Sequence, residues 1–491
     1  MTDRATVAVV GAGIGGLAAT LDLAASGHDV ILLERRDVPG GKIRQVHAGG
    51  KGVDSGPTVF TMRWVFEELF QAAGLNLDDH VTLSSSPVLA RHSWPDGSRL
   101  DLFTDIDASC AAITEFSSAR EADAYRRFAS IAQGRFETLD HSFMRSEKPS
   151  AVSLSRSVGL RGLPRLYATN PFQTLWAELG QIFTDPRLRQ LFGRYSTYTG
   201  SSPFEAPATL ALISHAERVG VWLVEGGMVQ LPIAIAKAAA AAGAEIRYGA
   251  HVDALERRGS RFVIEVSAGD TIEADAVVFN GDVNALSKGL LGETVRRALP
   301  DRRSEKRSLS ALTWSLSSAD VDFPLEHHTV FFGGDYPAEF RALDTESIAD
   351  EPTVYVCAQD RHNGAAPPVG EPERLFLLVN APATRLRDEQ IEQAEESAMS
   401  LLSRQGFNVA LDGADVERRT PDDFERLFPG SAGAIYGWPT HGWSGSFRRS
   451  GAATSVPGLF CAGGTVHPGP GIPMAAQSGR IAAARVRKYL S

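Results

Sequence analysis

TVAVVGAGIGGLAATLDLAASGHDVILLE, residues 6–34, is the stretch that decides the fold. Its first five residues are apolar or β-branched, which is typical of a buried parallel strand. The alanine- and leucine-rich segment that follows predicts a helix ending at Gly27, and HDVILLE predicts a second strand. A strand, a helix and a strand in this order form a βαβ unit, whose right-handed crossover places both strands in one parallel sheet.

Three glycines, Gly11, Gly13 and Gly16, form the pattern G-x-G-x-x-G between the first strand and the helix. In such a turn the first glycine allows a tight bend, the second lets the backbone approach a pyrophosphate, and the third allows close packing of helix on strand. The free N–H groups at the helix N-terminus favour a phosphate. Glu34, 18 residues after Gly16, can accept hydrogen bonds from ribose hydroxyls. Together these features predict a dinucleotide site.

The composition argues against several other classes of protein. With 491 residues the chain has room for two or three domains, and its net charge of −10 argues against nucleic acid as a partner. The cysteines, Cys110, Cys357 and Cys461, are far apart in sequence and form no Cys/His ligand pattern, so we expect no metal site, no disulfide framework and a reducing cytoplasm. We also expect no signal peptide and no transmembrane helix, because no apolar run reaches ~18 residues.

A second glycine-rich turn, CAGGTVHPGPGIP at residues 461–473, lies near the C-terminus. It follows the strand-like run VPGLF and precedes a helix-like run that begins near Met474. Gly463 and Gly464 allow the backbone to approach a ligand, and the N-terminus of the following helix can stabilise negative charge on that ligand. This turn is therefore predicted to form the other half of the cofactor site.

The order of the motifs resembles the flavin amine oxidase and phytoene desaturase superfamily of FAD-binding proteins. The matching elements are the first glycine motif, an acidic residue, VPGGK at residues 38–42, DSGPT at 54–58 and EGGM at 225–228. HPGPGIP at residues 467–473 resembles the C-terminal signature of carotenoid desaturases, which general amine oxidases lack. DPRLRQLFGRYSTYTGSSP, FFGGDYPAEF and YGWPTHGWSGSFRR are similar to bacterial 1-hydroxycarotenoid 3,4-desaturases, and the resemblance covers essentially the whole chain.

The resemblance implies FAD as the cofactor and assigns further residues to its site. Gly41 and Lys42 would lie against the flavin diphosphate and ring, Pro57 and Thr58 near the isoalloxazine, and Val252 would contact the adenine through its backbone. The expected cofactor-binding residues are Gly11, Gly13, Ile14, Gly15, Gly16, Glu34, Arg35, Gly41, Lys42, Pro57, Thr58, Val252, Asp282, Gly463, Gly464, Pro473 and Met474.

No catalytic residue is assigned from the sequence. Asp335, His441 and His467 are candidates for a base, but each also fits a structural role, as a surface acid, a core histidine and a turn histidine. Four aromatic residues before the second glycine turn could line a substrate tunnel or form plain aromatic core: Tyr436, Trp438, Trp443 and Phe447.

The expected fold class is α/β, with a Rossmann-like FAD-binding domain interleaved with a mixed α+β substrate domain and a helical membrane-associated or lid region. The expected boundaries are residues 1–75, 215–290 and 445–491 for the FAD-binding domain, 76–140 and 291–444 for the substrate domain, and 141–214 for the helical segment.

Local patterns predict individual elements within these domains. Residues 89–103, LARHSWPDGSRLDLF, predict a β-hairpin across PDGS. Residues 244–256, AEIRYGAHVDALE, predict one strand, and residues 388–406 predict a long amphipathic helix that ends at Gly406.

A basic and aromatic segment, residues 148–177, contains no acidic residue. It combines Lys148, Arg156, Arg161 and Arg165 with aliphatic and aromatic side chains. Such a segment can lie in an anionic membrane interface, although a basic surface helix packed on its own domain has the same composition. We therefore expect a cytoplasmic protein that associates peripherally with the inner face of the membrane.

The resemblance implies, as the expected function, FAD-dependent introduction of the C3–C4 double bond into acyclic 1-hydroxycarotenoids. The alternatives are a phytoene desaturase or a carotenoid isomerase of the same fold, a soluble amine oxidase, and a non-catalytic protein that binds FAD or a carotenoid. Only one dinucleotide motif is visible in the sequence, so the expected partners are a lipophilic carotenoid substrate and oxygen or a quinone as electron acceptor.

Overall fold

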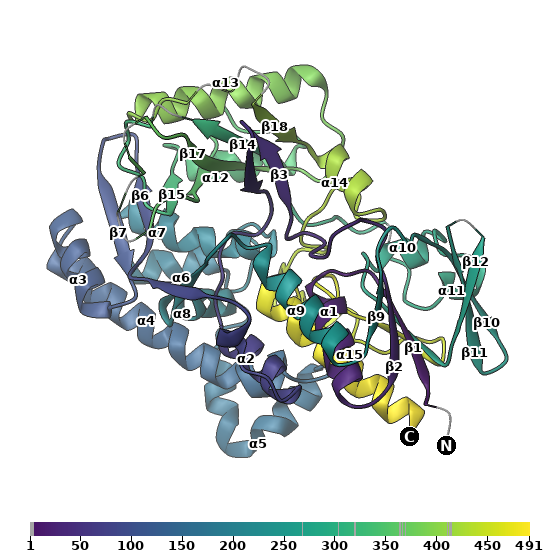
Figure 1. The fold of residues 1–491 in the computed structure, drawn as a ribbon. Helices are drawn as coiled ribbons and strands as arrows, with labels where there is room; N and C mark the ends of the chain where they lie inside the picture. Colours follow the sequence, from purple (N-terminus) through teal and green to yellow (C-terminus); the bar gives the residue numbers. More distant parts are fainter. Residues whose placement is uncertain are drawn as a thin grey trace.

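The computed structural model describes residues 4–267, 269–302, 304–318, 321–362, 365, 367–368, 370–409, 411 and 415–491. Two large sheets dominate the described fold, and helices pack around both of them (Figure 1). The class is α/β with mixed sheets, as the sequence predicts.

A five-stranded parallel sheet carries the first glycine motif. Its strands are β1 (Thr6–Val10), β2 (Asp29–Leu33), β9 (Glu245–Arg247), β13 (Ala276–Phe279) and β19 (Leu459–Cys461). Their order is β19-β13-β1-β2-β9, and every neighbouring pair is parallel. β1 pairs with β2 from Thr6↔Asp29 to Val10↔Leu33, so the predicted βαβ unit is confirmed. β1 lies in the centre of the sheet, which explains why the residues on both faces of this strand are mostly apolar.

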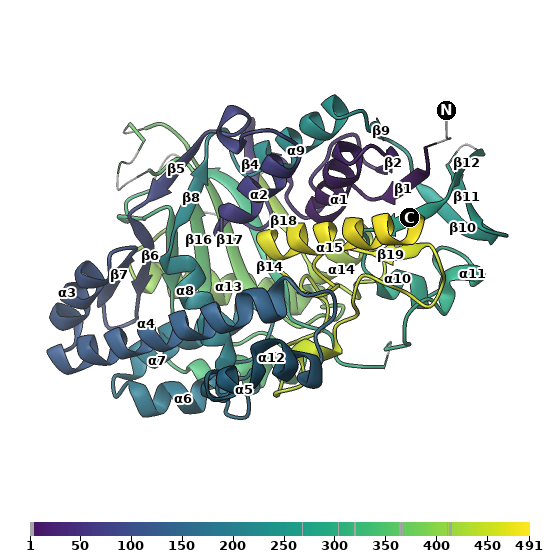
Figure 2. The ribbon, with the colours of Figure 1, turned by 90° about the horizontal axis from the view of Figure 1, so that it is seen from below.

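Helices from both ends of the chain cover this sheet together. α1 (Ile14–Ala25) packs against α15 (Ile472–Leu490) and against α9 (Gln230–Ala241). Figure 2 shows α15 beside α1, and both views place the two termini on the same side of the molecule. The turns that precede α1 and α15 are consequently brought to one edge of the parallel sheet.

The second large sheet has seven strands. Its strands are β6 (Val88–Ser93), β7 (Arg99–Phe103), β14 (Ser310–Ser318), β15 (His328–Phe331), β16 (Val354–Ala358), β17 (Glu373–Ala381) and β18 (Val416–Arg419). The order is β18-β14-β17-β16-β15-β6-β7. Among the described strands of this sheet, β15 and β6 form the one parallel pair, and the other neighbouring pairs are antiparallel. Its apolar face packs against α13 (Asp388–Arg404), the green helix at the top of Figure 1. The predicted hairpin at 89–103 and the helix ending at Gly406 are both confirmed.

Three smaller sheets flank the two large ones. They are β3 (Gln45–Ala48) with β4 (Lys51–Asp54), β5 (Leu83–Ser86) with β8 (Val221–Val224), and β10 (Val252–Arg258) with β11 (Arg261–Val266) and β12 (Asp270–Ala274). The prediction of one strand over residues 244–256 is wrong, because β9 joins the parallel sheet whereas β10 begins a separate antiparallel sheet. Gly249 adopts φ +65° between them, and this left-handed turn ends the first strand.

The remaining described elements are mostly helical. They are α2 (Trp64–Ala72), α3 (Ile106–Phe116), α4 (Ala119–Leu139), α5 (Ala151–Ala168), α6 (Leu175–Ile182), α7 (Pro186–Gly193), α8 (Leu212–Arg218), α10 (Asn284–Ser287), α11 (Glu293–Arg296), α12 (Tyr336–Asp344), α14 (Pro421–Leu427), and the short turns η1 (Leu77–Asp79), η2 (Asp140–Met144), η3 (Arg194–Thr199), η4 (Ala208–Ala211) and η5 (Ser446–Arg448). No helix in the described part of the chain has both the length and the hydropathy needed to cross a bilayer.

Candidate functional site

The two glycine turns meet at the carboxyl edge of the parallel sheet. A Cβ atom on Gly15, in the first turn of α1, would lie 2.8 Å from the backbone nitrogen of Gly463, which follows β19. Asn280, at the end of β13, lies between them, and its Nδ2 donates to the carbonyl oxygen of Gly11 at 3.2 Å. A Cβ atom on Gly13 would lie 2.7 Å from the same Nδ2 atom. Turns separated by more than four hundred residues therefore form one continuous backbone surface.

Glu34 and the turn VPGGK at residues 38–42 lie against the first glycine motif. Glu34 is buried and accepts hydrogen bonds from the backbone N–H groups of Ala12, at 2.7 Å, and Arg36, at 3.0 Å. Gly41 adopts φ +61°, and a Cβ there would lie 3.0 Å from the Cα atom of Gly13. A carboxylate at the end of the second strand is thus held rigidly beside the loop in which the sequence predicts the dinucleotide.

Buried basic side chains gather beside the second turn. Lys42 Nζ donates to the carbonyl oxygen of Ile435 at 2.6 Å, and Arg449 Nη1 donates to that of Gly464 at 3.4 Å. Arg307 Nη2 donates to the carboxylate of Asp282 at 2.6 Å. Burial lowers the pKa of Lys42 to about 8, although the nearby charge of Asp282 acts in the opposite direction. Burial, together with repulsion from neighbouring arginines, lowers the pKa of Arg449 to about 9.

This cluster of Lys42, Arg307, Arg449 and Asp282 fits an anionic ligand. It places three basic groups around one carboxylate, and buried charges without counter-charges are costly. Arg307 Nη1 is buried and has no hydrogen-bond partner in the described structure. A diphosphate next to the glycine turns would supply negative charge and acceptor oxygens, so the described residues fit the group that the sequence predicts.

The buried cluster is expected to make FAD binding dependent on pH. The folded-state pKa of Lys42, about 8, lies below its ordinary value of 10.5, so between these values the unfolded chain binds more protons and this group makes the apoprotein more stable as pH rises. A bound diphosphate raises that pKa. Binding of FAD to apoprotein at pH 9 is therefore expected to take up about one proton.

Calorimetry in buffers of different ionisation enthalpy measures this proton uptake, and Lys42→Met is expected to reduce it. Zero uptake by the unaltered protein at pH 9 would contradict the placement of Lys42 beside the diphosphate.

The other expected cofactor residues have separate environments. Arg35 donates to the carbonyl oxygen of Leu427 at the end of α14. Pro57 is exposed, whereas Thr58 is buried with its Oγ1 atom 2.6 Å from the Tyr355 hydroxyl. Ile14 and Gly16 begin α1, Pro473 and Met474 lie in the first turn of α15, and Val252 begins β10 beside the parallel sheet.

Sequence reasoning missed three residues of this site. It assigns no role in the site to Asn280, Arg307 or Arg449. A polar residue directly after a buried strand could have indicated Asn280, because the carboxyl ends of parallel strands form ligand sites. The two arginines have no local pattern that marks them, since Arg307 lies in a loop and Arg449 follows η5.

All three candidate bases have structural contacts; Nε2 of His441, for example, accepts from the backbone N–H of Ser202 at 3.2 Å. Asp335 is the N-cap of α12, where its carboxylate accepts from the Ala338 backbone N–H at 2.9 Å. His467 is buried, with Nε2 donating to the Phe143 carbonyl oxygen at 2.9 Å, and burial lowers its pKa to about 4. His441 lies 3.2 Å from Glu205, and burial lowers its pKa.

The four aromatic residues separate into core and surface. Trp438 is buried between the guanidinium groups of Arg302 and Arg307, each 4.4 Å from its ring, so it packs in the core. Trp443 is 49% exposed. Tyr436 and Phe447 are partly buried.

Comparison with known proteins agrees with a flavin site. The model of the family described as flavin containing amine oxidoreductase matches residues 14–487. The chain belongs to this family and is a flavin-dependent oxidoreductase whose cofactor is FAD. At the level of the fold, a putrescine oxidase and the cyclohexylamine oxidase from Brevibacterium oxydans are similar, each at 16% identity with 99% of both chains covered and a TM-score of 0.61.

Comparison of sequences separates the relatives of this chain more finely than comparison of folds does. The chain is 46% identical to hydroxyneurosporene desaturase of Rubrivivax gelatinosus, over 99% of this chain and 93% of that protein. It is 43% identical to the protein of the same name from Cereibacter sphaeroides, over 97% and 96%. The phytoene dehydrogenase of Streptomyces griseus is 33% identical, over 98% and 94%.

Proposed function

We propose that this protein is an FAD-dependent carotenoid desaturase that introduces the C3–C4 double bond into acyclic 1-hydroxycarotenoids. One observation carries the proposal: identity to hydroxyneurosporene desaturases reaches 42–46% along almost the whole chain, whereas identity to phytoene dehydrogenase is 33%. The amine oxidases match at the level of the fold alone, at 16% identity.

The chain's own residues position and enclose the reaction. FAD, when bound, supplies the two-electron oxidant for a C–H bond of the substrate. The glycine turns at Gly15 and Gly463 and the basic cluster hold the cofactor, while α15 begins at Ile472 with its positive helix end beside the second turn. The seven-stranded sheet lies beside the parallel sheet in Figure 1, and we expect it to help exclude water from the reacting bond.

Product analysis tests the proposed reaction. Purified, FAD-loaded protein is incubated with liposomes that contain either a 1-hydroxycarotenoid or phytoene, and the products are separated and identified by absorption spectra. We expect a red-shifted product, longer by one conjugated double bond, from the hydroxylated substrate alone. Conversion of phytoene instead would retain the flavin chemistry but reject the proposed substrate, and an unchanged double-bond count with altered geometry would indicate an isomerase.

We further propose that the protein docks on the inner face of an anionic membrane, from which it draws its lipophilic substrate, and that oxygen or a quinone accepts the electrons. The segment around α5 supports docking because Tyr167 and Phe172 are 78% and 71% exposed. Phe172 lies 5.9 Å from Trp443, and Lys148 lines the groove of about 270 Å³ that contains Trp443. Exposed rings next to basic side chains suit a headgroup boundary.

The basic part of the docking surface is only partly described. Arg156 and Arg165 are exposed on α5, which is interrupted at Gly159 with φ +63°. The structure does not describe the side chains of residues 157, 158 and 160–163. Arg161, which belongs to the basic segment predicted from the sequence, is one of them.

Removing the two neighbouring rings is expected to weaken membrane binding. The double variant Phe172→Ser/Trp443→Ser should bind anionic liposomes at least about tenfold more weakly, because two aromatic side chains lose apolar contact with the acyl boundary. Sedimentation of FAD-loaded protein with liposomes measures this. The matched control, Tyr248→Ser/Leu290→Ser, removes two exposed apolar side chains elsewhere and should bind normally. Equal losses in both variants would reject this surface.

A further inference from the structure

A cavity of about 350 Å³ lies between β8, with the turn at residues 225–228 that follows it, and the part of the seven-stranded sheet that contains β15, β16 and β17. Its wall contains Thr58, Trp222, His327, Cys357 and Gln359. Other lining side chains are Asp54, Thr82, Ser84, Glu225, His362 and Arg374, together with residues 223, 224 and 226–228. The wall combines polar side chains with apolar surface from Trp222, Leu223, Val224 and Met228, which suits the polar end group of a largely apolar molecule.

The cavity is connected to the dinucleotide motif by a series of close backbone contacts. Gly41 packs against Gly13, as described above, and a Cβ on Gly56 would lie only 2.1 Å from the carbonyl oxygen of Lys42. Gly56 precedes by two residues Thr58, which lines the cavity. The cavity is therefore lined by Thr58 of a segment that packs on Lys42, and Lys42 directly follows Gly41, which contacts Gly13 of the first motif.

The proposed substrate needs a polar subsite at such a place. In a 1-hydroxycarotenoid, only C1 and C2 separate the hydroxyl oxygen from C3, so the hydroxyl must bind close to where the C3–C4 bond reacts. A tertiary hydroxyl taken out of water requires an acceptor for its proton. This step rests on the proposed function.

His327 and Cys357 have the chemistry for this role. His327 Nδ1 donates to the carbonyl oxygen of Arg361 at 2.9 Å, which leaves Nε2 as an acceptor. Burial lowers the pKa of His327 to about 4, so the imidazole is neutral at pH 7. Nε2 lies 3.6 Å from the Cys357 sulfur, and burial raises the pKa of that thiol to about 12. An alcohol O–H is a stronger donor to Nε2 than the weak S–H group that now lies there.

We propose that His327, supported by Cys357, forms the subsite that binds the tertiary hydroxyl group of the substrate. The substrate hydroxyl donates to Nε2 of His327, and the thiol remains protonated as a weak donor toward the alcohol oxygen. This arrangement selects carotenoids that carry a hydroxyl at C1 over those that do not.

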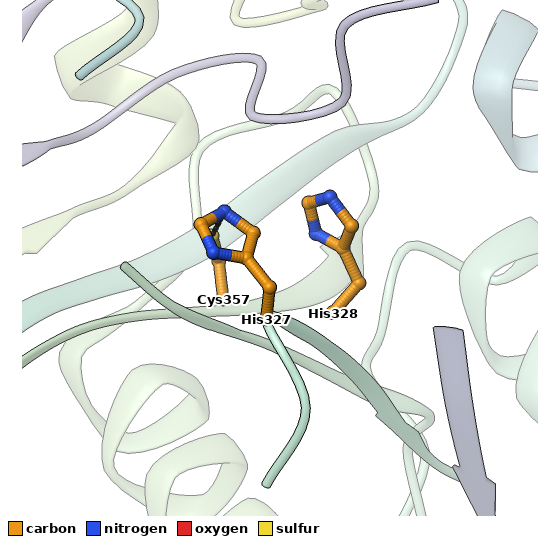
Figure 3. Close-up of side chains that lie close together, drawn as sticks. All are labelled: His327, His328 and Cys357. Carbon is orange, nitrogen blue, oxygen red and sulfur yellow. Dashed lines mark hydrogen bonds between the residues drawn. The ribbon is translucent and has the colours of Figure 1, made fainter. Parts of the chain in front are cut away.

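A metal ion is the competing occupant of the same cluster. His327, His328 and Cys357 offer ligand atoms within 4.8 Å of one another (Figure 3). However, His328 Nδ1 already pairs with the Tyr355 hydroxyl at 2.7 Å, which in turn pairs with Thr58. Among the residues that line the cavity in the described structure, His327 and Cys357 occur but His328 does not. The observations thus favour a two-residue subsite over a three-ligand metal centre.

Paired substrates and matched variants test the subsite. The FAD-loaded protein is assayed in liposomes with a 1-hydroxycarotenoid and with the same carotenoid lacking the hydroxyl, for kcat/KM and for binding by quenching of tryptophan fluorescence. We expect His327→Leu to lower kcat/KM for the hydroxylated substrate at least about tenfold and for the other less than about twofold. His327→Gln, which keeps an acceptor, should retain most of the preference, and His47→Ala, at an exposed histidine, should retain all of it.

Each outcome of these assays either supports or rejects the hydroxyl-binding subsite. Unchanged preference in His327→Leu, or about one zinc ion per chain in the purified protein by mass spectrometry, would overturn the subsite. If His327→Leu fails to fold, loss of preference in Cys357→Ala with retention in His327→Gln supports it, and unchanged preference in Cys357→Ala rejects the role of the thiol. If neither carotenoid is converted, the proposed function fails, while hydroxyl-dependent binding that His327→Leu removes would still support the subsite.

Discussion

Gly479→Ala is expected to lower the free energy of unfolding by about 3 kcal/mol or more and to weaken FAD binding at least tenfold. Gly479 lies in α15 where this helix crosses α1. A Cβ atom there would lie 2.0 Å from the carbonyl oxygen of Gly15 and 3.1 Å from the Cβ of Ala18. The first contact is with backbone, which cannot rotate away as a flexible side chain can. The two helices must therefore separate, and the turns at Gly15 and Gly463 separate with them.

Urea denaturation of the FAD-loaded protein measures the stability, and flavin fluorescence measures the release of the cofactor. Gly134→Ala is the matched control, because Gly134 also lies in a helix, α4, and a Cβ there would meet no atom within 4 Å. Alanine at that exposed position should stabilise the protein by up to about 1 kcal/mol through its helix propensity. If Gly479→Ala behaved like the control, α1 and α15 would not be packed as the structure has them.

Asp282→Asn is expected to lower the stability of the apoprotein by about 3–5 kcal/mol. Asp282 is the carboxylate that faces the buried basic groups: its Oδ2 accepts from Arg307 at 2.6 Å, and its charge favours the protonated form of Lys42. The amide keeps the shape of the side chain but leaves Lys42, Arg307 and Arg449 without this counter-charge. The loss arises from the cations that stay buried rather than from the hydrogen bond alone.

Bound FAD should reduce this loss, because the diphosphate supplies negative charge to the same cluster. The stability gap between FAD-loaded and apoprotein is therefore expected to be larger in Asp282→Asn than in the unaltered protein. Asp335→Asn is the control, since the Asp335–Arg341 pair is exposed and its loss should cost less than about 1 kcal/mol. If Asp282→Asn lowered the stability of the apo and FAD-loaded forms equally, the result would show that the basic cluster does not contact the cofactor.

Elements with a strong local pattern were predictable from the sequence. The βαβ unit at residues 6–34, the hairpin at 89–103 and the helix ending at Gly406 all agree with the structure, because the hydrophobic period and the turn residues act over short distances. Residues 244–256 show where such reasoning fails. Continuous apolar alternation looks like one strand, but the pairing partners, β2 on one side and β11 on the other, divide it between two sheets.

By itself, the sequence determined the dinucleotide turn, its acidic residue, the family resemblance and the second glycine turn, because each depends on residue types at fixed local spacing. Only the tertiary structure decided that Gly15, Asn280 and Gly463 lie together, that Arg307 and Arg449 join Lys42 around Asp282, and that His327 faces a cavity next to Cys357. These contacts join segments far apart in the chain. They form because the parallel sheet aligns the ends of β1, β13 and β19 and because the β15–β16 pairing places His327 near Cys357, which no local spacing encodes.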